Sequence, residues 1–327
     1  MPLDTVLSRR ACVAAAAALG MARAFGSEAE PLRLLVAYPP GGPTDVLARQ
    51  MEPVAQRALA RRVLVDNVPG VAGGLGVQRL LAATGPSPTV LVGSPSETLL
   101  APLVNKTLSY QPEQLRLIGL VTHLPVALVG GAHLVEPNLA ALLQRRTAAS
   151  PSFSYGSYGI GSHALLVGED FSARARLPLL HVPYNGVAPL LRDLVGRQID
   201  LAFLPLTLQV RDLVDQGRLR MYGLASSRAS LRSPTETPIE RHAGFDGFRH
   251  DLWSGVFVAR TAPAAWAEQA QQLVRAVSSD PAFAQRKKEE GIEVASPVSA
   301  VAVETWFAAE VGRYRTLVER LAIGLNA

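Results

Sequence analysis

Cysteine is almost absent from this chain, and the position of the single one excludes several chemistries. Cys12 lies near the start, inside an apolar, alanine-rich run that follows Ser8-Arg9-Arg10. Once that segment is removed, the chain can form no disulfide, no cysteine-ligated zinc site and no thiol nucleophile. Stability must then come from the hydrophobic core, and roughly 300 residues are enough for two domains.

The N-terminal segment has the pattern of a secretory signal. The arginine pair precedes an apolar run from Ala11 to Ala22, and Ala22-Arg23-Ala24 fits an A-x-A cleavage site. The run is too short for a resident membrane helix, and no second long apolar run follows. We expect residues 1–26 to be a signal peptide of the Sec or twin-arginine type, and the mature protein to be soluble in the periplasm. Cys12 follows Arg10 too closely for a lipoprotein.

Charge and missing motifs exclude most other classes. The formal charge is +5 with dispersed basic residues, which suits anionic solutes and is not the footprint of a nucleic-acid binder. The sequence contains no P-loop, H-E-x-x-H or G-x-S-x-G motif, and its histidines show no metal-ligand spacing. Residues 159–164 match the weak dinucleotide pattern G-x-G-x-x-A, but the next strand carries no acidic residue for a ribose. We therefore expect no metal, no cofactor and no nucleic-acid partner.

Short apolar runs alternate with segments of helix length along almost the whole chain. This alternation predicts an α/β fold with largely parallel sheets. The expected strands are Leu32–Ala37, Val63–Val65, Val90–Val92, Ile118–Val121, Val126–Val129, Phe153–Tyr155, Leu179–Val182, Leu201–Leu204, Met221–Ala225 and Val256–Ala259. Apolar residues at helical spacing from Val303 to Leu321 predict a last helix, with Ser296 and Pro297 at its start.

The most informative stretch is YPPGGPTD at residues 38–45. It links a predicted buried strand to a predicted helix. Gly41 and Gly42 let the backbone approach a ligand closely, and Thr44 or Asp45 can cap the helix. The N–H groups at a helix start carry partial positive charge and suit a carboxylate or phosphate. For this stretch alone, a capped turn without a ligand is an equal alternative.

Other loops that follow predicted strands have a similar composition. They are residues 93–96 (GSPS), residues 156–163 (GSYGIGSH) and residues 183–186 (PYNG). Ligands of open parallel sheets bind beyond the carboxyl ends of the strands. Ser157 and Ser162 offer hydroxyls, and Tyr184 offers an aromatic wall with a hydroxyl tip. Several such loops in one exported chain predict a polar anion pocket rich in backbone groups.

Longer blocks of the sequence carry a resemblance to a known family. They are YPPGGPTDVLAR at 38–49, VDNVPGVAGGLG at 65–76, SYGSYGIGSHALLVGE at 154–169, HVPYNGVAPLLRDLVGRQIDLAF at 181–203, GRLRMYGLASSR at 217–228 and WSGVFVARTAP at 253–263. Over nearly the whole mature chain, the sequence resembles the Bug family, the extracytoplasmic solute receptors of tripartite tricarboxylate transporters.

The resemblance implies a two-lobed Venus-flytrap fold of the type 2 periplasmic-binding-protein kind. Two crossing strands would connect the lobes, near His123–Pro125 and near Ala225–Arg228, and the lobes would close by hinge motion. Lobe one would then comprise residues 27–123 plus 228–327, and lobe two residues 124–227. We expect a monomer.

The resemblance also implies a function and a site. Family members bind small carboxylates without turnover and deliver them to membrane transporter subunits or to a sensor protein. The implied ligand-binding residues are Tyr38, Gly41, Gly42, Pro43, Thr44 and Asp45 on lobe one and Ser157, Gly161, Ser162 and Tyr184 on lobe two. Ser94, in the loop after Val90–Val92, and Leu204 complete the predicted site.

Leu204 is also where this chain departs from its relatives. They often carry an acidic residue after QIDLAF, and that acid can pair with the amino group of a ligand. The apolar Leu204-Pro205-Leu206 therefore disfavours an amino acid and favours an aliphatic or aromatic carboxylate. The loop before the strand at Val90 also departs, with Pro86-Ser87-Pro88 in place of D-G-Y.

Two further functions are compatible with parts of the sequence. An exported hydrolase or cofactor-dependent enzyme is the first alternative, because twin-arginine substrates fold before export. A regulatory effector domain of the same fold is the second. The export signal and the absence of a helix-turn-helix pattern count against the regulator.

Overall fold

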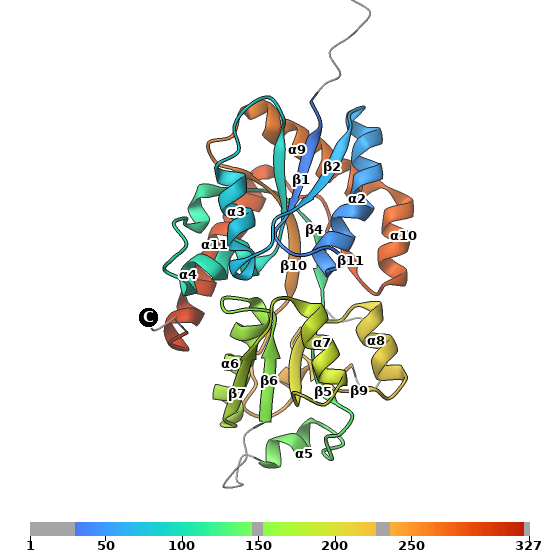
Figure 1. Ribbon diagram of the computed structural model, residues 1–327, viewed down its shortest axis with the longest axis vertical. Coiled ribbons are helices and arrows are strands. Elements are labelled where there is room, and N and C mark those ends of the chain that lie inside the picture. The colour runs from blue at the N-terminus through green and yellow to red at the C-terminus, as the bar shows by residue number, and fades with distance from the viewer. Residues whose placement is uncertain (1–29, 146–152, 227–235, 324–327) are drawn as a thin grey trace, which may run out of the picture.

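Two α/β lobes stacked along the long axis of the molecule form the computed structural model (Figure 1). The structure describes residues 30–145, 153–226 and 236–323, so the predicted signal peptide lies outside the described residues. One lobe is built on a six-stranded sheet and the other on a five-stranded sheet, which confirms the predicted α/β class. In the part of the chain that the structure describes, no helix is both long and apolar enough to span a bilayer.

The sheet of lobe one has the strand order β11-β4-β10-β3-β1-β2. Its strands are β1 (Leu32–Val36), β2 (Val63–Asn67), β3 (Thr89–Gly93), β4 (Leu115–Leu124), β10 (Leu252–Ala259) and β11 (Glu293–Val294). β1 pairs in parallel with β2 and β3, whereas β10 runs antiparallel to β3 and β4. The sheet is mixed rather than largely parallel, because β4 leaves the lobe and β10 returns to it in the opposite direction.

Helices cover both faces of this sheet, because successive side chains of its strands point to opposite faces. Leu34 and Val36 of β1 pack on the side of α2 and α9, and Leu35 packs on the side of α11. The helices and helical turns of lobe one are α2 (Pro43–Leu59), η1 (Val71–Gly73), α3 (Gly74–Leu81), η2 (Ser96–Leu100), α4 (Ala101–Val104), η3 (Pro112–Gln114), α9 (Ala264–Ser279), α10 (Pro281–Glu289) and α11 (Ala300–Arg320). The predicted last helix is therefore α11, which begins after Ser299 rather than at Ser296, since the Ser299 hydroxyl accepts the Ala302 N–H at 3.2 Å.

The sheet of lobe two has the strand order β7-β6-β8-β5-β9. Its strands are β5 (Val126–Gly131), β6 (Phe153–Ser157), β7 (Leu179–Pro183), β8 (Leu201–Pro205) and β9 (Leu219–Leu224). Its helices and helical turns are α5 (Leu139–Gln144), α6 (His163–Ala175), α7 (Val187–Val195), α8 (Leu208–Asp215) and η5 (Ile239–Arg241). One face of the sheet packs against α6 and an aromatic cluster, and the other packs against α7 and α8.

The first crossing between the lobes is the passage from β4 through Pro125 to β5. The second lies near Leu252, later than the predicted Ala225–Arg228, and Arg228 itself lies outside the described residues. The segment before β10 lies on lobe two, because the His250 N–H donates to the Ala225 carbonyl at 2.6 Å. We therefore assign residues 236–250 to lobe two.

Aromatic packing holds this returning segment on lobe two. Phe245 stacks on Phe171 of α6 with a centroid distance of 5.3 Å, and Phe248 meets Phe203 of β8 at 6.2 Å. All four rings are fully buried. The boundary was misplaced because residues 236–250 have no strand or helix period, and only their packing partners show where they belong.

A buried carboxylate ties the last helix of lobe one to lobe two. Asp170 of α6 accepts hydrogen bonds from His250 Nε2 at 2.8 Å, Arg174 Nε at 3.0 Å and Arg320 Nη2 at 2.7 Å. Arg320 ends α11, so this contact joins elements of the two lobes away from the strands that cross between them (Figure 1).

Replacement of Phe171 by Ala is expected to destabilise the protein by about 3–5 kcal/mol, because a fully buried ring is lost and a cavity is left. Urea unfolding measures the change. Leu180→Ala is the control, since that side chain is 64% exposed and its loss should cost about 0.5 kcal/mol or less. In a cycle with Phe245→Ala, additive effects would contradict the contact between the two rings.

Candidate ligand-binding site

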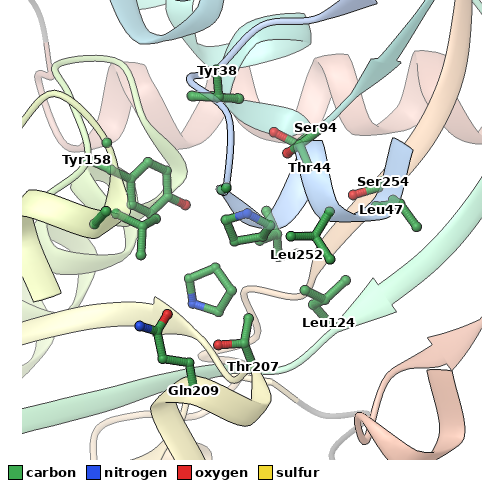
Figure 2. Close-up of a pocket in the computed structure, with 18 of the residues that line it drawn as sticks. Tyr38, Thr44, Leu47, Ser94, Leu124, Tyr158, Thr207, Gln209, Leu252 and Ser254 are labelled. Atoms are coloured by element: carbon green, nitrogen blue, oxygen red, sulfur yellow. The ribbon is translucent and has the colours of Figure 1, made fainter. Parts of the chain in front are cut away.

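A cavity of about 370 Å³ lies between the two lobes. Residues 38–44 line it from lobe one, and residues 185–189 and 207–209 line it from lobe two. Leu124 and Leu252, at the ends of the two crossing strands, also contribute to its wall (Figure 2). The cavity therefore sits beside the two strands that cross between the lobes.

The carboxylate of Asp45 holds the loop of lobe one in shape. It accepts the Gly41 N–H at 2.8 Å, the Asn67 amide at 2.9 Å and the Arg49 Nε at 3.0 Å. Gly41 has a φ of +84°, a conformation that glycine adopts without strain. Asn67 also donates to the Tyr38 carbonyl at 3.0 Å, so the loop is fixed at both ends.

Asp45 stays ionised although it is buried. Burial alone would raise its pKa, but the hydrogen bonds from Arg49, Gly41 and Asn67 outweigh that effect and lower the pKa below the usual range. The Asp45 carboxylate therefore accepts hydrogen bonds from the protein itself.

Three helices begin at the cavity. The N-cap of α2 is Gly42 and that of α7 is Gly186, and neither helix has a side-chain cap. In α8 the Thr207 hydroxyl accepts the Val210 N–H, which leaves the first-turn amides of Leu208 and Gln209 beside the cavity. Amides and helix dipoles at such starts favour a negatively charged group.

Hydroxyl groups and apolar side chains form the rest of the wall. Figure 2 shows the Tyr158 hydroxyl directed towards the centre of the cavity, and Ser94 beside Thr44 on the side of lobe one. Leu47 and Leu252 give the cavity a hydrocarbon surface. The arrangement suits a small molecule with an anionic end and an apolar body.

The two formally charged side chains in the cavity wall neutralise each other. Of the described residues that line the cavity, Lys287 and Glu290 alone are formally charged, and Lys287 Nζ lies 2.6 Å from Glu290 Oε2. Gln50 donates to the other oxygen of Glu290 at 2.9 Å. Burial lowers the pKa of Lys287, and the pairing with Glu290 offsets part of that effect. An anion in this cavity would therefore be held by dipoles rather than by a free cation.

Half of the predicted site residues line the cavity. They are Tyr38, Gly41, Gly42, Pro43, Thr44 and Ser94, all on lobe one. Asp45 lies behind them and organises the loop. The predicted residues of lobe two, namely Ser157, Gly161, Ser162, Tyr184 and Leu204, do not line it.

Most of the lobe two residues are engaged elsewhere in the fold. Ser157 Oγ lies 2.7 Å from His181 Nε2, and the Tyr184 hydroxyl donates to Asp193 at 3.1 Å. Ser162 caps α6 through a hydrogen bond from the Leu165 N–H. Gly161 packs against lobe one, where an added Cβ would lie 3.1 Å from the Cα of Ala101.

Leu204 lies in the core of lobe two between the sheet and α7 and α8. It is fully buried, and the next residue, Pro205, lines the cavity in its place. The difference follows from the period of two along a strand, which turns neighbouring side chains to opposite faces. Since Leu204 does not reach the cavity, it gives no reason to exclude an amino-acid ligand.

Tyr158, the first turn of α7 and the start of α8 also line the cavity, and the sequence did not single them out. Tyr158 directly follows the predicted Ser157, which does not line it. For α8, Thr207 carries a recognisable signal, because a cap residue directly after a buried strand marks a helix start at the edge of the sheet.

Comparison with known proteins identifies the family. A family model described as tripartite tricarboxylate transporter family receptor matches residues 47–323. The chain belongs to this receptor family. Among curated relatives of the receptor, a UPF0065 protein of Bordetella pertussis is 28% identical over 295 residues, which cover 90% of each chain.

Solved structures show the same fold. The periplasmic binding protein BugD matches the receptor with a TM-score of 0.81 and 24% identity, over 90% of this chain and 98% of that chain. A protein of R. palustris, solved with adipate, matches with a TM-score of 0.82 and 23% identity, over 91% and 99% of the two chains. The family model confirms the predicted membership of the Bug family, and the structural matches confirm the two-lobed fold.

The described residues form no metal centre. Within residues 30–145, 153–226 and 236–323, no group of three or more His, Cys, Asp or Glu side chains could hold a metal ion.

Replacement of Asp45 by Ala is expected to lower stability by about 2–3 kcal/mol near neutral pH, because three donors lose their acceptor. Since the pKa of Asp45 is lowered in the folded state, this stabilisation is present above about pH 4 and is lost as the pH falls further. Chemical unfolding of wild type and variant across pH measures both effects.

The control for this prediction is Asp66→Ala. Asp66 is 36% exposed and lies 3.5 Å from Arg33, so its loss should cost about 0–1 kcal/mol. Equal losses in the two variants would show that the Asp45 network does not hold the loop.

Proposed function

We propose that this protein is a periplasmic receptor that captures a small carboxylate between its lobes and presents it to membrane transporter subunits or to a sensor. One observation carries the proposal. Helices α2 and α7 belong to opposite lobes, both begin at the same cavity, and neither has a side-chain cap. A carboxylate placed there receives amide donors from both lobes, so binding favours the closed form.

The family supports the same function. The matching model describes transporter receptors, and a structural relative was solved with adipate, a dicarboxylate. The export signal predicted for residues 1–26 agrees with a periplasmic location. Binding and release by hinge motion require no catalytic group, so we propose a receptor that does not turn its ligand over.

The cavity limits the size and charge of the ligand. A volume of about 370 Å³ is near the lower end for small-molecule sites, which span roughly 300–1,000 Å³. Among the described lining residues, the carboxylate of Glu290 is the one that could meet an ammonium group, and Lys287 already neutralises it. We therefore propose a carboxylate without an amino group. This preference now rests on Glu290 rather than on Leu204.

A thermal-shift screen of the mature protein tests the proposal. Adipate, malate and benzoate are the acids, with glutamate, glucose and ATP as controls. A ligand that binds only the folded state raises Tm in proportion to RT ln(1 + [L]/Kd). The expected result is a rise confined to one or a few acids without an amino group. A rise with ATP alone, or conversion of any compound during incubation, would contradict a carboxylate receptor.

Replacement of Thr44 by Val tests the site itself. The variant keeps the shape of the side chain but removes a hydroxyl beside the α2 amides, so the Kd of the bound acid should rise about tenfold or more. Isothermal titration calorimetry measures the change. The control is Thr316→Val on α11, whose hydroxyl bonds to the Gly312 carbonyl on the exposed surface. An unchanged Kd in Thr44→Val would place the acid elsewhere.

A further inference from the structure

A buried carboxyl group lies directly behind the lobe one wall of the cavity. Glu97 belongs to η2, a single π-helical turn that follows β3, and its side chain is fully buried. Gly73 of η1 makes room for it, because a Cβ at Gly73 would lie 2.7 Å from the Glu97 Cβ. π-helical turns are rare and frequently lie at functional sites.

The donors that hold Glu97 belong to the wall of the cavity. Glu97 Oε1 accepts the Ser94 N–H at 2.5 Å, and Oε2 accepts the Ser94 hydroxyl at 2.7 Å. The Tyr38 hydroxyl donates to the same Oε2 at 2.9 Å. Ser94 and Tyr38 both line the cavity, so one hydroxyl group separates Glu97 from the cavity.

Neutral groups surround Glu97. The Tyr110 hydroxyl donates to its carbonyl at 2.5 Å, and the Tyr158 phenol lies on the side of lobe two. On α6, burial keeps the pKa of His163 well below its usual value, so this imidazole is uncharged. On α3, Arg79 is exposed to solvent.

The Arg313–Glu310 pair on α11 is internal to that helix. The Arg313 guanidinium holds Glu310 at 2.8 Å. No Lys, Arg or His in the described ranges forms an ion pair with Glu97. Burial raises the pKa of Glu97 to about 7, although hydrogen bonds from Ser94 and Tyr38 act in the opposite direction.

The two ionisation states of Glu97 present different groups to the cavity. When Glu97 is ionised, the Ser94 and Tyr38 hydroxyls both donate to it, and their oxygens face a ligand as acceptors. When Oε2 is protonated, it can donate to Ser94 Oγ, and the Ser94 hydrogen is then available to a ligand. Ionised Glu97, which is fully buried, would also repel a carboxylate in the cavity.

We propose that the cavity takes up its carboxylate together with one proton, which resides on Glu97 and turns the Ser94 hydroxyl into a donor towards the ligand. This inference rests on the proposed carboxylate-binding function. Glu97 acts through Ser94 and Tyr38 and is therefore a positioning residue rather than a ligand contact.

The proposal predicts tighter binding in acid. Affinity scales with the protonated fraction of Glu97, so Kd should be about tenfold higher near pH 8 than near pH 6. The probes are adipate, malate and benzoate, screened by thermal shift at both pH values. For any acid that raises Tm, calorimetry measures the Kd.

In Glu97→Gln, Kd should change less than about twofold between the two pH values. Glu113→Gln, an exchange at an exposed site paired with Arg315, should keep the wild-type dependence.

Proton uptake by wild type tests the proposal without a variant. Calorimetry near pH 8 in buffers of different ionisation enthalpy should show close to one proton bound per acid. A Kd equal at both pH values with no proton uptake would overturn the role of Glu97 and leave the receptor function standing. The same dependence in wild type and Glu97→Gln would also overturn it. No rise in Tm with any acid at either pH would overturn the receptor function, and the proton coupling with it.

Discussion

The hydrogen bonds to Asp45 fix the loop on which the rest of the site depends. This buried carboxylate joins Gly41, Asn67 and Arg49, and so connects the loop after β1 to the end of β2 and the first turns of α2. Because its charge is satisfied inside the protein, Asp45 does not oppose an anion in the cavity as strongly as a free carboxylate would. The amides at the start of α2 are thereby held in place before any ligand arrives, which lowers the entropic cost of binding.

The other charged side chains in or near the cavity are also bound by groups of the protein itself. Lys287 is neutralised by Glu290, and Glu97 lies behind hydroxyl groups. In the proposed function, dipoles from both lobes supply the attraction for an anion. A cation fixed on one lobe would bind an anion in the open form as well. Amides divided between α2 and α7 can all reach the anion only when the lobes are closed, so they would favour the closed form. Differential binding to the closed form is what lets a ligand shift the equilibrium between the two forms.

Much of the fold could be predicted from the sequence, because its signals are local. Apolar runs marked the strands, and Gly-Pro loops marked the edge of lobe one that borders the cavity. Some features could not be predicted from local patterns. Residues 236–250 belong to lobe two through contacts that are distant in sequence, such as that of Phe245 with Phe171. Leu204 and Pro205 are neighbours, and which of them faces the cavity depends on how the strand lies in its sheet. Ser157 and Tyr184 look available in sequence but bond to His181 and Asp193. Neither composition nor spacing shows such partners.

The decisive measurement is a crystal structure of the protein with the acid that gives the largest thermal shift. We expect one carboxylate group between the lobes, with oxygens within about 3.2 Å of first-turn amides of both α2 and α7. We also expect no lysine or arginine side chain on that group. A carboxylate bound to one lobe alone, or held by a cation outside the cleft, would contradict capture by the dipoles of both lobes.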